Sequence, residues 1–335
     1  MFILELSSTK ELNPLIVDFF RKKHTKEIVW KKELASSDVQ SELVSKTVDS
    51  KLVIKYKIEI MYQRRFLRKL MNYLDDLGAP VGEAIYEAFC RLSSGVEEKF
   101  YHVFYPIFEI DKLESLSELN TVILKENVNI ISQGTTGLIT WQASQALAEW
   151  ALKTSIEKKT ILELGSGTGM AGLVVASSTS CGRYIFTDCH SDVLSLLTEN
   201  VELNCDKPLE KVEPEKDLLF SGSIENCKVE IRKLDWDTSG VDDCEEIGSV
   251  DLIFASDVVY DKDLFEPLTK TIKLFLQNGT TAAIIAFTQR DESTVNSFRE
   301  HLESMDLNIK WLETPKPNYL SWQILPIIHI IEVTL

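Results

Sequence analysis

The sequence has 335 residues, of which 44% are hydrophobic and 26% are charged, with 14 glycines and 9 prolines. This composition excludes fibrous and intrinsically disordered proteins, and the length is sufficient for one large domain with a smaller companion. A formal net charge of −16 disfavours a surface that grips nucleic acid, since phosphates must be neutralised by Lys and Arg, and it suits a basic protein surface or a small cationic ligand.

Membrane and secretion signals are not evident. The longest apolar run, Ile324 to Val333, contains Pro326, His329 and Glu332 and is far shorter than the ~20 residues of a membrane span. The N-terminus has no basic leader and no small-residue cleavage site. The six cysteines are scattered without a CxxC pair, which favours reduced thiols in a cytosolic or nuclear protein. We expect a cytoplasmic monomer that binds no metal, no membrane and no nucleic acid directly.

Residues 1–115 are predicted to form a mainly helical N-terminal domain. Apolar residues recur at helical spacing around 15–20, 61–74 and 85–92. Nothing here suggests chemistry. The basic stretch Arg64–Lys69 is interpreted as the solvated face of a helix, with a protein or RNA contact as the alternative. The following segment, 121–132, has the β-branched alternation of a strand or hairpin.

From Lys159 onward, short apolar strands alternate with amphipathic helices. This alternation predicts a mostly parallel sheet with helices on both faces. Two final strands, within 306–313 and 323–335, are joined without room for a crossover helix and should pair antiparallel. The outline over residues 116–335 is that of the Rossmann-like α/β fold with a seven-stranded class I methyltransferase sheet and an antiparallel terminal hairpin. The polar segment 209–226 is expected to be a surface loop.

The loop Glu163–Gly169 directly follows the first strand of this pattern and opens a helix. Its glycines allow a sharp turn and a close approach of the backbone to a ligand. A dinucleotide is the alternative ligand, but the leading Glu163 and the GxGxG spacing argue against it. Asp188 ends the second strand, where a carboxylate accepts hydrogen bonds from ribose hydroxyls in either class of cofactor.

Two later strand ends extend the same site. After the third strand, Asp235 can accept from an adenine amino group, and Trp236 offers an apolar wall for the ring. Ala255, Asp257 and Tyr260 follow at the end of the fourth strand, beside the point where strand order reverses. Nucleic-acid amino-methyltransferases carry prolines between the acid and the Tyr at this place. This chain has two valines, which argues against a nucleobase substrate.

Upstream of the glycine loop, a Gly- and Thr-rich loop leads into a predicted helix that ends near residue 151. Trp141 stands just before this helix, and we expect it to face the ligand. Trp150 falls on the apolar stripe of the helix and is expected in the core.

The segments GTTGLITW, ELGSGTG, LDW, SDVVYD and AFTQRDEST together resemble methyltransferase family 16 of the seven-β-strand lysine methyltransferases. The resemblance covers about Val122 to the C-terminus. ELGSGTG is a general methyltransferase signal, whereas the Trp141 loop and the Asp257–Tyr260 motif are more specific. The stretches IISQGTTGLITW and AFTQRDEST are most similar to members that methylate a lysine of translation elongation factor 2. Gln142 departs from the family pattern, which often has an acid there, and we expect no loss of activity from it.

The resemblance implies a protein-lysine N-methyltransferase that uses S-adenosylmethionine, with elongation factor 2 as its protein partner and the N-terminal domain helping to dock it. Asp257 and Tyr260 would be the catalytic pair in the lysine channel, where Asp257 orients the amine and the proton leaves through water. His190 is interpreted as a helix-start residue rather than a base. The cofactor contacts implied by the resemblance are Trp141, Gly165, Ser166, Gly167, Asp188, Trp236 and Ala255. Asp235 is a further expected contact, proposed above from its place after the third strand.

Three other interpretations stay open. A nicotinamide dehydrogenase would need GxGxxG together with a catalytic Tyr-Lys or His arrangement, and this combination is not evident in the sequence. A methyltransferase acting on another protein or on a small molecule can be distinguished from one acting on elongation factor 2 by a substrate assay. A non-catalytic methyltransferase-like adaptor is disfavoured because every expected cofactor position is intact.

Overall fold

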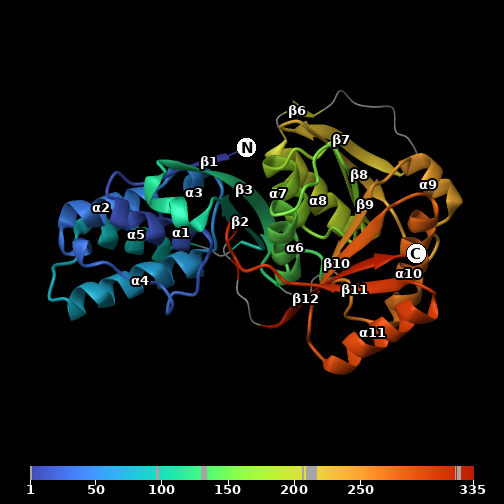
Figure 1. Cartoon of the computed structure of the whole chain (residues 1–335). Coiled ribbons are helices and arrows are strands. Elements are labelled where there is room, and N and C mark those ends of the chain that lie inside the picture. The colour runs from blue at the N-terminus through green and yellow to red at the C-terminus, as the bar shows by residue number, and fades with distance from the viewer. Residues whose placement is uncertain are drawn as a thin grey trace. The chain divides into compact units, whose positions relative to one another are not determined.

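The computed structural model of the chain describes residues 2–95, 98–129, 134–205, 207–208, 217–320, 322 and 326–335. It consists of two compact units, Phe2–Asn129 and Ile130–Leu335 (Figure 1). The sequence suggests a boundary at 115/116. The structure divides later, because the strand Glu118–Asn127 pairs with other strands of the first unit. Within the described ranges, no helix is long and apolar enough to cross a membrane.

The N-terminal unit combines helices with a small sheet. The sheet is antiparallel with the order β1-β3-β2, so the alternating segment after residue 120 forms β3, while its last residues, 130–132, lie outside the described part. Its elements are β1 (Phe2–Glu5), α1 (Asn13–Phe20), α2 (Ser37–Lys46), α3 (Lys51–Lys55), α4 (Ile60–Asp76), α5 (Glu83–Ser93), β2 (Phe100–Ile107) and β3 (Glu118–Asn127).

Aromatic side chains fill the core of this unit. The Phe19 ring of α1 meets the Phe66 ring of α4 edge-on at 4.9 Å, and the Phe20 ring meets that of Phe104 at the same distance. Phe66 belongs to a buried stripe of α4, and the opposite face of that helix carries the basic stretch. Arg65 on this face is exposed and pairs with Glu59. The face is therefore solvated, as the sequence indicates.

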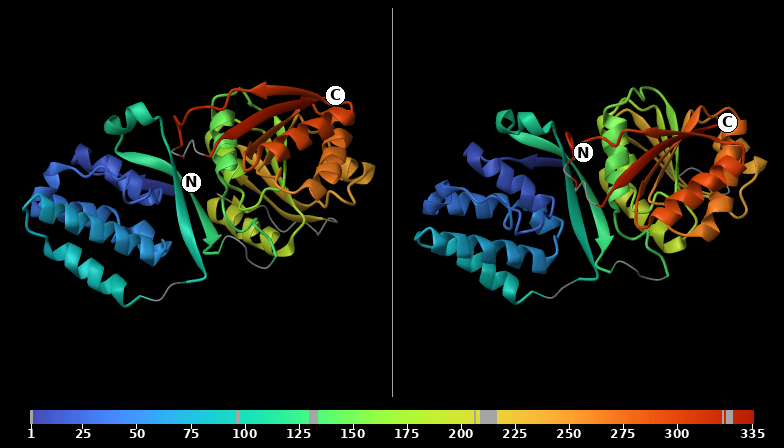
Figure 2. Two further views of the ribbon diagram at one scale, coloured as in Figure 1. Left: turned by 90° about the horizontal axis from the view of Figure 1, so that it is seen from below. Right: turned by 60° about the horizontal axis from the view of Figure 1, so that its bottom comes forward.

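The second unit contains one large sheet with helices on both faces (Figure 2). Its strands are β4 (Thr160–Leu164), β5 (Arg183–Asp188), β6 (Lys207–Pro208), β7 (Leu218–Ile224), β8 (Cys227–Lys233), β9 (Leu252–Ser256), β10 (Ala282–Thr288), β11 (Asn308–Leu312) and β12 (Ile328–Thr334). Its helices are α6 (Gln142–Leu152), α7 (Met170–Ser178), α8 (Ser191–Asn204), α9 (Val241–Ile247), α10 (Phe265–Gln277) and α11 (Glu292–Ser304).

The strand order confirms the fold expected from the sequence. Among the described residues the order is β11-β12-β10-β9-β4-β5-β8-β7-β6. The neighbours from β10 through β9, β4 and β5 to β8 are parallel, and β11 and β12 form the antiparallel hairpin that pairs with β10. These seven strands are the class I methyltransferase sheet. The chain leaves β4 toward β5 and later returns to its other side as β9, so a ligand cleft is expected at the carboxyl ends of these strands.

One part of the sequence interpretation is wrong. Residues 218–224, expected to belong to a surface loop, form β7, which pairs antiparallel with β8 and extends the sheet edge. Its inward positions, Phe220, Gly222 and Ile224, alternate as in a half-buried strand, but Gly222 supplies no apolar side chain and so weakens the apolar signal. The rest of that expected loop, 209–216, lies outside the described residues.

Packing on the two faces of the large sheet positions its loops. On one face, apolar residues of β4, β9 and β10 pack against α9, α10 and α11. On the other face, α6, α7 and α8 contact the sheet, and Trp150 of α6 meets Phe254 of β9 edge-on at 6.0 Å. Trp150 therefore packs against the sheet, but it is only partly buried, so it lies at the edge of the core that its helical spacing indicates.

Candidate active site

A cavity of about 440 Å³ opens at the carboxyl ends of β4, β5, β8 and β9. This volume falls in the range of small-molecule and cofactor sites. The cavity is lined by nine of the ten site residues expected from the sequence: Trp141, Gly165, Ser166, Gly167, Asp188, Asp235, Trp236, Asp257 and Tyr260. Ala255 is not among the lining residues, because it is fully buried within β9 and paired with β4 and β10.

The glycine loop between β4 and α7 forms the floor. Gly165 and Gly167 have φ of +67° and +54°, the left-handed region that favours glycine. A Cβ on Gly165 would lie 3.0 Å from Val258 and 3.3 Å from the Trp236 ring. The backbone therefore turns tightly under a close aromatic neighbour, and larger residues would be strained at both positions.

Ser166 and Asp188 fasten this loop to β5. The Ser166 N–H donates to the Thr187 carbonyl at 2.8 Å, and the Ser166 hydroxyl accepts from the Thr187 N–H at 3.0 Å. Asp188 Oδ2 accepts from the Gly167 N–H at 3.3 Å, while Oδ1 accepts from the N–H groups of Cys189 and His190. Burial raises the pKa of Asp188, and these backbone hydrogen bonds oppose that rise. Because each carboxylate oxygen has two lone pairs, Asp188 keeps the capacity to accept from a ligand hydroxyl.

The loop after β8 supplies a flat wall. Trp236 packs against Gly165, and Asp235 beside it accepts from the Asp237 N–H at 3.1 Å. A half-buried indole beside a half-buried carboxylate suits a heteroaromatic ring that carries an amino group.

A second loop, residues 134–141, leads into α6 and covers the glycine loop. The hydroxyls of Thr140 and Thr168 lie 2.8 Å apart, and Trp141 Nε1 donates to the Thr136 carbonyl at 3.1 Å. These bonds fix the Trp141 ring at the cavity wall. The threonine pair was not expected from the sequence, because it joins two loops that are distant in the chain.

Asp257 lies at the end of β9 with φ of +53°, a strained conformation for a residue with a side chain. Its Oδ1 accepts from the Thr288 N–H at 2.9 Å, and its Oδ2 accepts from the Thr288 hydroxyl at 3.1 Å and the Ala143 N–H at 3.2 Å. The carboxylate thus ties β9 to β10 and to the start of α6, while its acceptor capacity is not exhausted.

Tyr260 is 47% exposed at the rim of the cavity. Partial burial raises the pKa of its phenol, and the nearby Thr136 side chain lowers it by less. Tyr260 is therefore neutral at physiological pH. Its ring can meet a cation face-on, since the face of a phenol ring is electronegative.

His190 caps α8, as the sequence indicates. It is the N-cap residue, and its Nδ1 accepts from the Asp192 N–H at 3.3 Å. A nitrogen used in this way is not available as a base. Across the described ranges, no group of three or more His, Cys, Asp and Glu residues is placed to hold a metal ion.

Comparison with known proteins identifies the family. The family model described as "Lysine methyltransferase" matches residues 122–305. The chain is 31% identical over 289 residues to the mouse (Mus musculus) "Protein-lysine N-methyltransferase EEF2KMT", covering 85% of this chain and 80% of that protein. It is 29% identical to the human (Homo sapiens) protein of the same name, covering 85% and 82%. The chain belongs to the lysine methyltransferase family.

Membership makes this chain an enzyme, a protein-lysine N-methyltransferase with a protein substrate, and S-adenosylmethionine is its methyl donor. The residues of the cavity fit this cofactor. Five lining residues are aspartates, and neither Lys nor Arg is among the described residues that line it, which suits a sulfonium cation. The close approach of the glycine loop and the free acceptor capacity of Asp188 suit a ribose.

Proposed function

We propose that this chain transfers methyl groups from S-adenosylmethionine to a lysine of translation elongation factor 2. The proposal is carried by one observation: Trp141, Asp257 and Tyr260 meet at the rim of a single acidic cavity, in a chain similar over most of its length to relatives named EEF2KMT. Transfer to another protein or to a small molecule is the second candidate, because the cavity itself does not fix what enters it.

In this proposal the cofactor lies across the glycine loop. Asp188 accepts from its ribose hydroxyls, and Asp235 and Trp236 hold the adenine. When bound, S-adenosylmethionine supplies the electrophilic methyl group. The chain contributes alignment, because displacement at that carbon requires the attacking amine to lie in line. Trp141 and Tyr260 wall the entry for the lysine, and Asp257 accepts a hydrogen bond from its amine.

The amine must lose its proton before it attacks, and the ordinary pKa of lysine is ~10.4. Apolar walls favour the neutral amine, whereas Asp257 favours the ammonium form. We therefore assign Asp257 to orienting the amine and stabilising the methylated cation. Since His190 already accepts a backbone hydrogen bond, the proton leaves through water.

The N-terminal unit is proposed to help dock the substrate. The family model begins at residue 122, so this unit is additional to the catalytic domain. The match to the mouse relative covers 85% of the chain, which is more than residues 130–335 can supply, so the similarity extends into the N-terminal unit. We place the reaction in the cytoplasm, where elongation factor 2 works, and the free cysteines agree with a reducing compartment.

The test is methyl transfer from radiolabelled S-adenosylmethionine to purified elongation factor 2 and to a whole lysate. We expect one labelled protein band that comigrates with elongation factor 2, and mass spectrometry then gives the lysine. A labelled protein of a different size would contradict the substrate assignment. Label confined to small molecules would favour the second candidate.

A further inference from the structure

Arg290 lies beside the cavity without lining it. It follows β10 and comes two residues after Thr288, the partner of Asp257. Its guanidinium carbon is 4.6 Å from the centroid of the Trp141 ring and 6.0 Å from that of the Tyr260 ring. The first distance is a close cation–π contact, and the second is at the outer limit of one. A cation is therefore held against the two aromatic walls of the lysine entry.

The hydrogen-bonding capacity of Arg290 is unused. The guanidinium of Arg290 has five N–H donors in its plane, and its contacts with the two rings are not conventional hydrogen bonds. Within the described part of the chain, Arg290 is exposed and makes no hydrogen bond or ion pair. Arg183 and Arg232 of the same unit both pair with Glu230. Arg290 thus combines a fixed position with free donors, which is the arrangement of a residue that recognises a planar anion.

The surrounding charge makes this cation distinctive. Residues 130–335 contain 17 Lys and Arg against 32 Asp and Glu. The cavity itself is lined by Asp188, Asp235, Asp237, Asp257 and Asp261. A carboxylate on an approaching substrate would be repelled by this lining and attracted at Arg290.

We propose that Arg290 is a specificity-determining residue that binds an Asp or Glu side chain flanking the target lysine. This inference rests on the proposed function, since it assumes that a protein lysine enters past Tyr260. Adjacent residues of an extended peptide are ~3.3–3.8 Å apart, so a flanking side chain can reach a guanidinium that borders the entry. The carboxylate of the cofactor is the other anion with the right chemistry, and the experiment must separate the two.

The experiment compares steady-state kinetics of the full-length enzyme and its R290Q and R290K variants on elongation factor 2. The second substrate is elongation factor 2 with any Asp or Glu within two positions of the mapped lysine replaced by its amide, and a mapped lysine without such a neighbour would overturn the proposal. We expect R290Q to raise KM for the native factor roughly tenfold, as the loss of ~1.4 kcal/mol would, with kcat nearly unchanged. The R290Q enzyme should have the same KM for the native and the amide-substituted factor. R290K should retain part of the discrimination, because it keeps the charge without the planar fork.

Lys262 provides the matched control. It is exposed in the loop after Tyr260, and Lys262→Gln makes the same change in net charge without removing a ring contact. We expect its KM to stay near that of the wild type. The wild-type KM should also rise with salt concentration, because the interaction is electrostatic. The difference in KM between the wild type and R290Q should therefore shrink as salt is added.

Several outcomes would overturn the proposal. Weaker binding of S-adenosylhomocysteine to R290Q in calorimetry would assign Arg290 to the cofactor's carboxylate. A higher kcat for R290Q would mean that Arg290 obstructs the lysine entry instead of binding the substrate. An unchanged KM would exclude a role of Arg290 in substrate recognition. If the wild type fails to methylate elongation factor 2, the proposed function is rejected on its own, and the same comparison is made on the protein labelled in the lysate.

Discussion

Asp257 and Ala143 are joined by a hydrogen bond of 3.2 Å from the Ala143 N–H to Oδ2, across 114 positions of sequence. Trp141 is the N-cap residue of α6 and makes no side-chain capping bond. Asp257, which directly follows β9, supplies the capping carboxylate instead. A carboxylate at a helix N-terminus is also favoured by the helix dipole. The acid expected to orient the lysine therefore also fixes the helix that begins at the aromatic wall.

This dual contact predicts that Asp257→Ala loses activity and some stability together. Loss of a cap costs ~1 kcal/mol, so we expect a fall in melting temperature of a few degrees. Single-turnover transfer should fall by a much larger factor, because the amine loses its hydrogen-bond acceptor. Melting temperature, cofactor affinity and single-turnover rate are measured on one preparation. Wild-type turnover by a folded, cofactor-bound Asp257→Ala enzyme would exclude any role in orienting the amine.

Asp188→Ala is expected to weaken cofactor binding while leaving the fold intact. The carboxylate accepts from the Gly167 N–H and is the acceptor proposed for the ribose hydroxyls, so its removal both loosens the glycine loop and removes those bonds. Two hydrogen bonds to a charged group correspond to at least ~3 kcal/mol, or more than 100-fold in the Kd for S-adenosylhomocysteine. This Kd is measured by calorimetry on the wild type and on Asp188→Ala. Asp263→Ala, in an exposed loop, is the control, and equal Kd values for the two variants would contradict the assignment.

Most of the catalytic fold could be predicted because its signals are local. Apolar strands, amphipathic helices and the glycine loop each occupy a few consecutive residues. The hairpin was expected from a short connection, whereas residues 313–327 separate β11 from β12 in the structure. The partners of the site residues could not be predicted in this way. The hydrogen bonds that join Asp257 to Ala143 and Thr288, and the position of Arg290 over the Trp141 ring, depend on which loops the folded sheet brings together. Strand β7 was missed because Gly222 supplies no apolar side chain at an inward position of its alternation.

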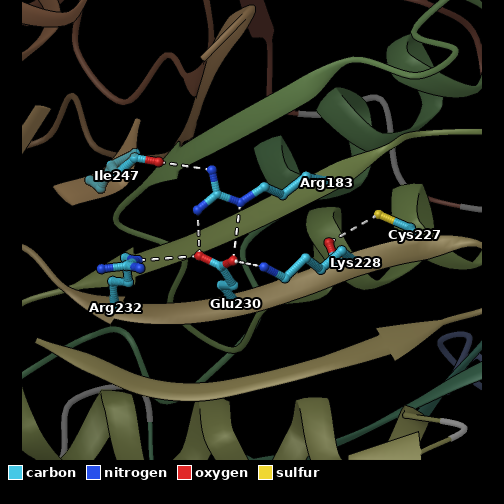
Figure 3. Close-up of polar contacts among 6 residues, drawn as sticks. All are labelled: Arg183, Cys227, Lys228, Glu230, Arg232 and Ile247. Atoms are coloured by element: carbon cyan, nitrogen blue, oxygen red, sulfur yellow. Dashed lines mark hydrogen bonds and ion pairs between the residues drawn. The ribbon is translucent and has the colours of Figure 1, made fainter. Parts of the chain in front are cut away.

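Glu230 holds a cluster of basic side chains on β5 and β8 (Figure 3). Oε1 accepts from Arg183 Nε at 3.1 Å and Lys228 Nζ at 2.7 Å, and Oε2 accepts from Arg232 Nε at 3.2 Å. Burial alone would raise the pKa of Glu230, but the hydrogen bonds and charges of Arg183 and Lys228 lower it to about 2. Arg183 also donates to the Ile247 carbonyl, so the cluster connects the sheet to α9.

Glu230→Gln is expected to destabilise the protein at neutral pH by about 3–5 kcal/mol, the typical effect of breaking a buried ion pair. A lowered folded-state pKa contributes stability above the ordinary value of 4.5 and loses it as pH falls toward 2. The difference between wild type and variant in urea unfolding should therefore be constant from pH 6 to 8 and shrink below pH 4.5. Glu245→Gln, exposed in α9, is the control. A difference that grows in acid would contradict this account.

Glu163 should give the opposite dependence on pH. It is fully buried near the end of β4, and burial raises its pKa from 4.5 to about 8, although the nearby hydroxyls of Ser166 and Tyr184 act against the shift. Neither carboxyl oxygen of Glu163 has a hydrogen-bond partner among the described residues. The folded protein therefore holds this proton more tightly than the unfolded chain, and unfolding releases it between these two values. The contribution of Glu163 to stability accordingly falls as pH rises from 4.5 and is fully lost above about 8.

Glu163→Gln keeps the shape of the side chain and removes the ionisation. We expect the melting temperature of the variant, relative to the wild type, to rise from pH 5 to about pH 8 and then to level off. The measurement is made by calorimetry without cofactor, so that ligand binding does not contribute, and the difference between proteins removes the effect of other titrating groups. Glu157→Gln, exposed just before β4, should track the wild type at every pH. If Glu163→Gln differs from the wild type by the same amount at pH 5 and pH 9, the carboxyl of Glu163 does not titrate in this range, and burial does not raise its pKa.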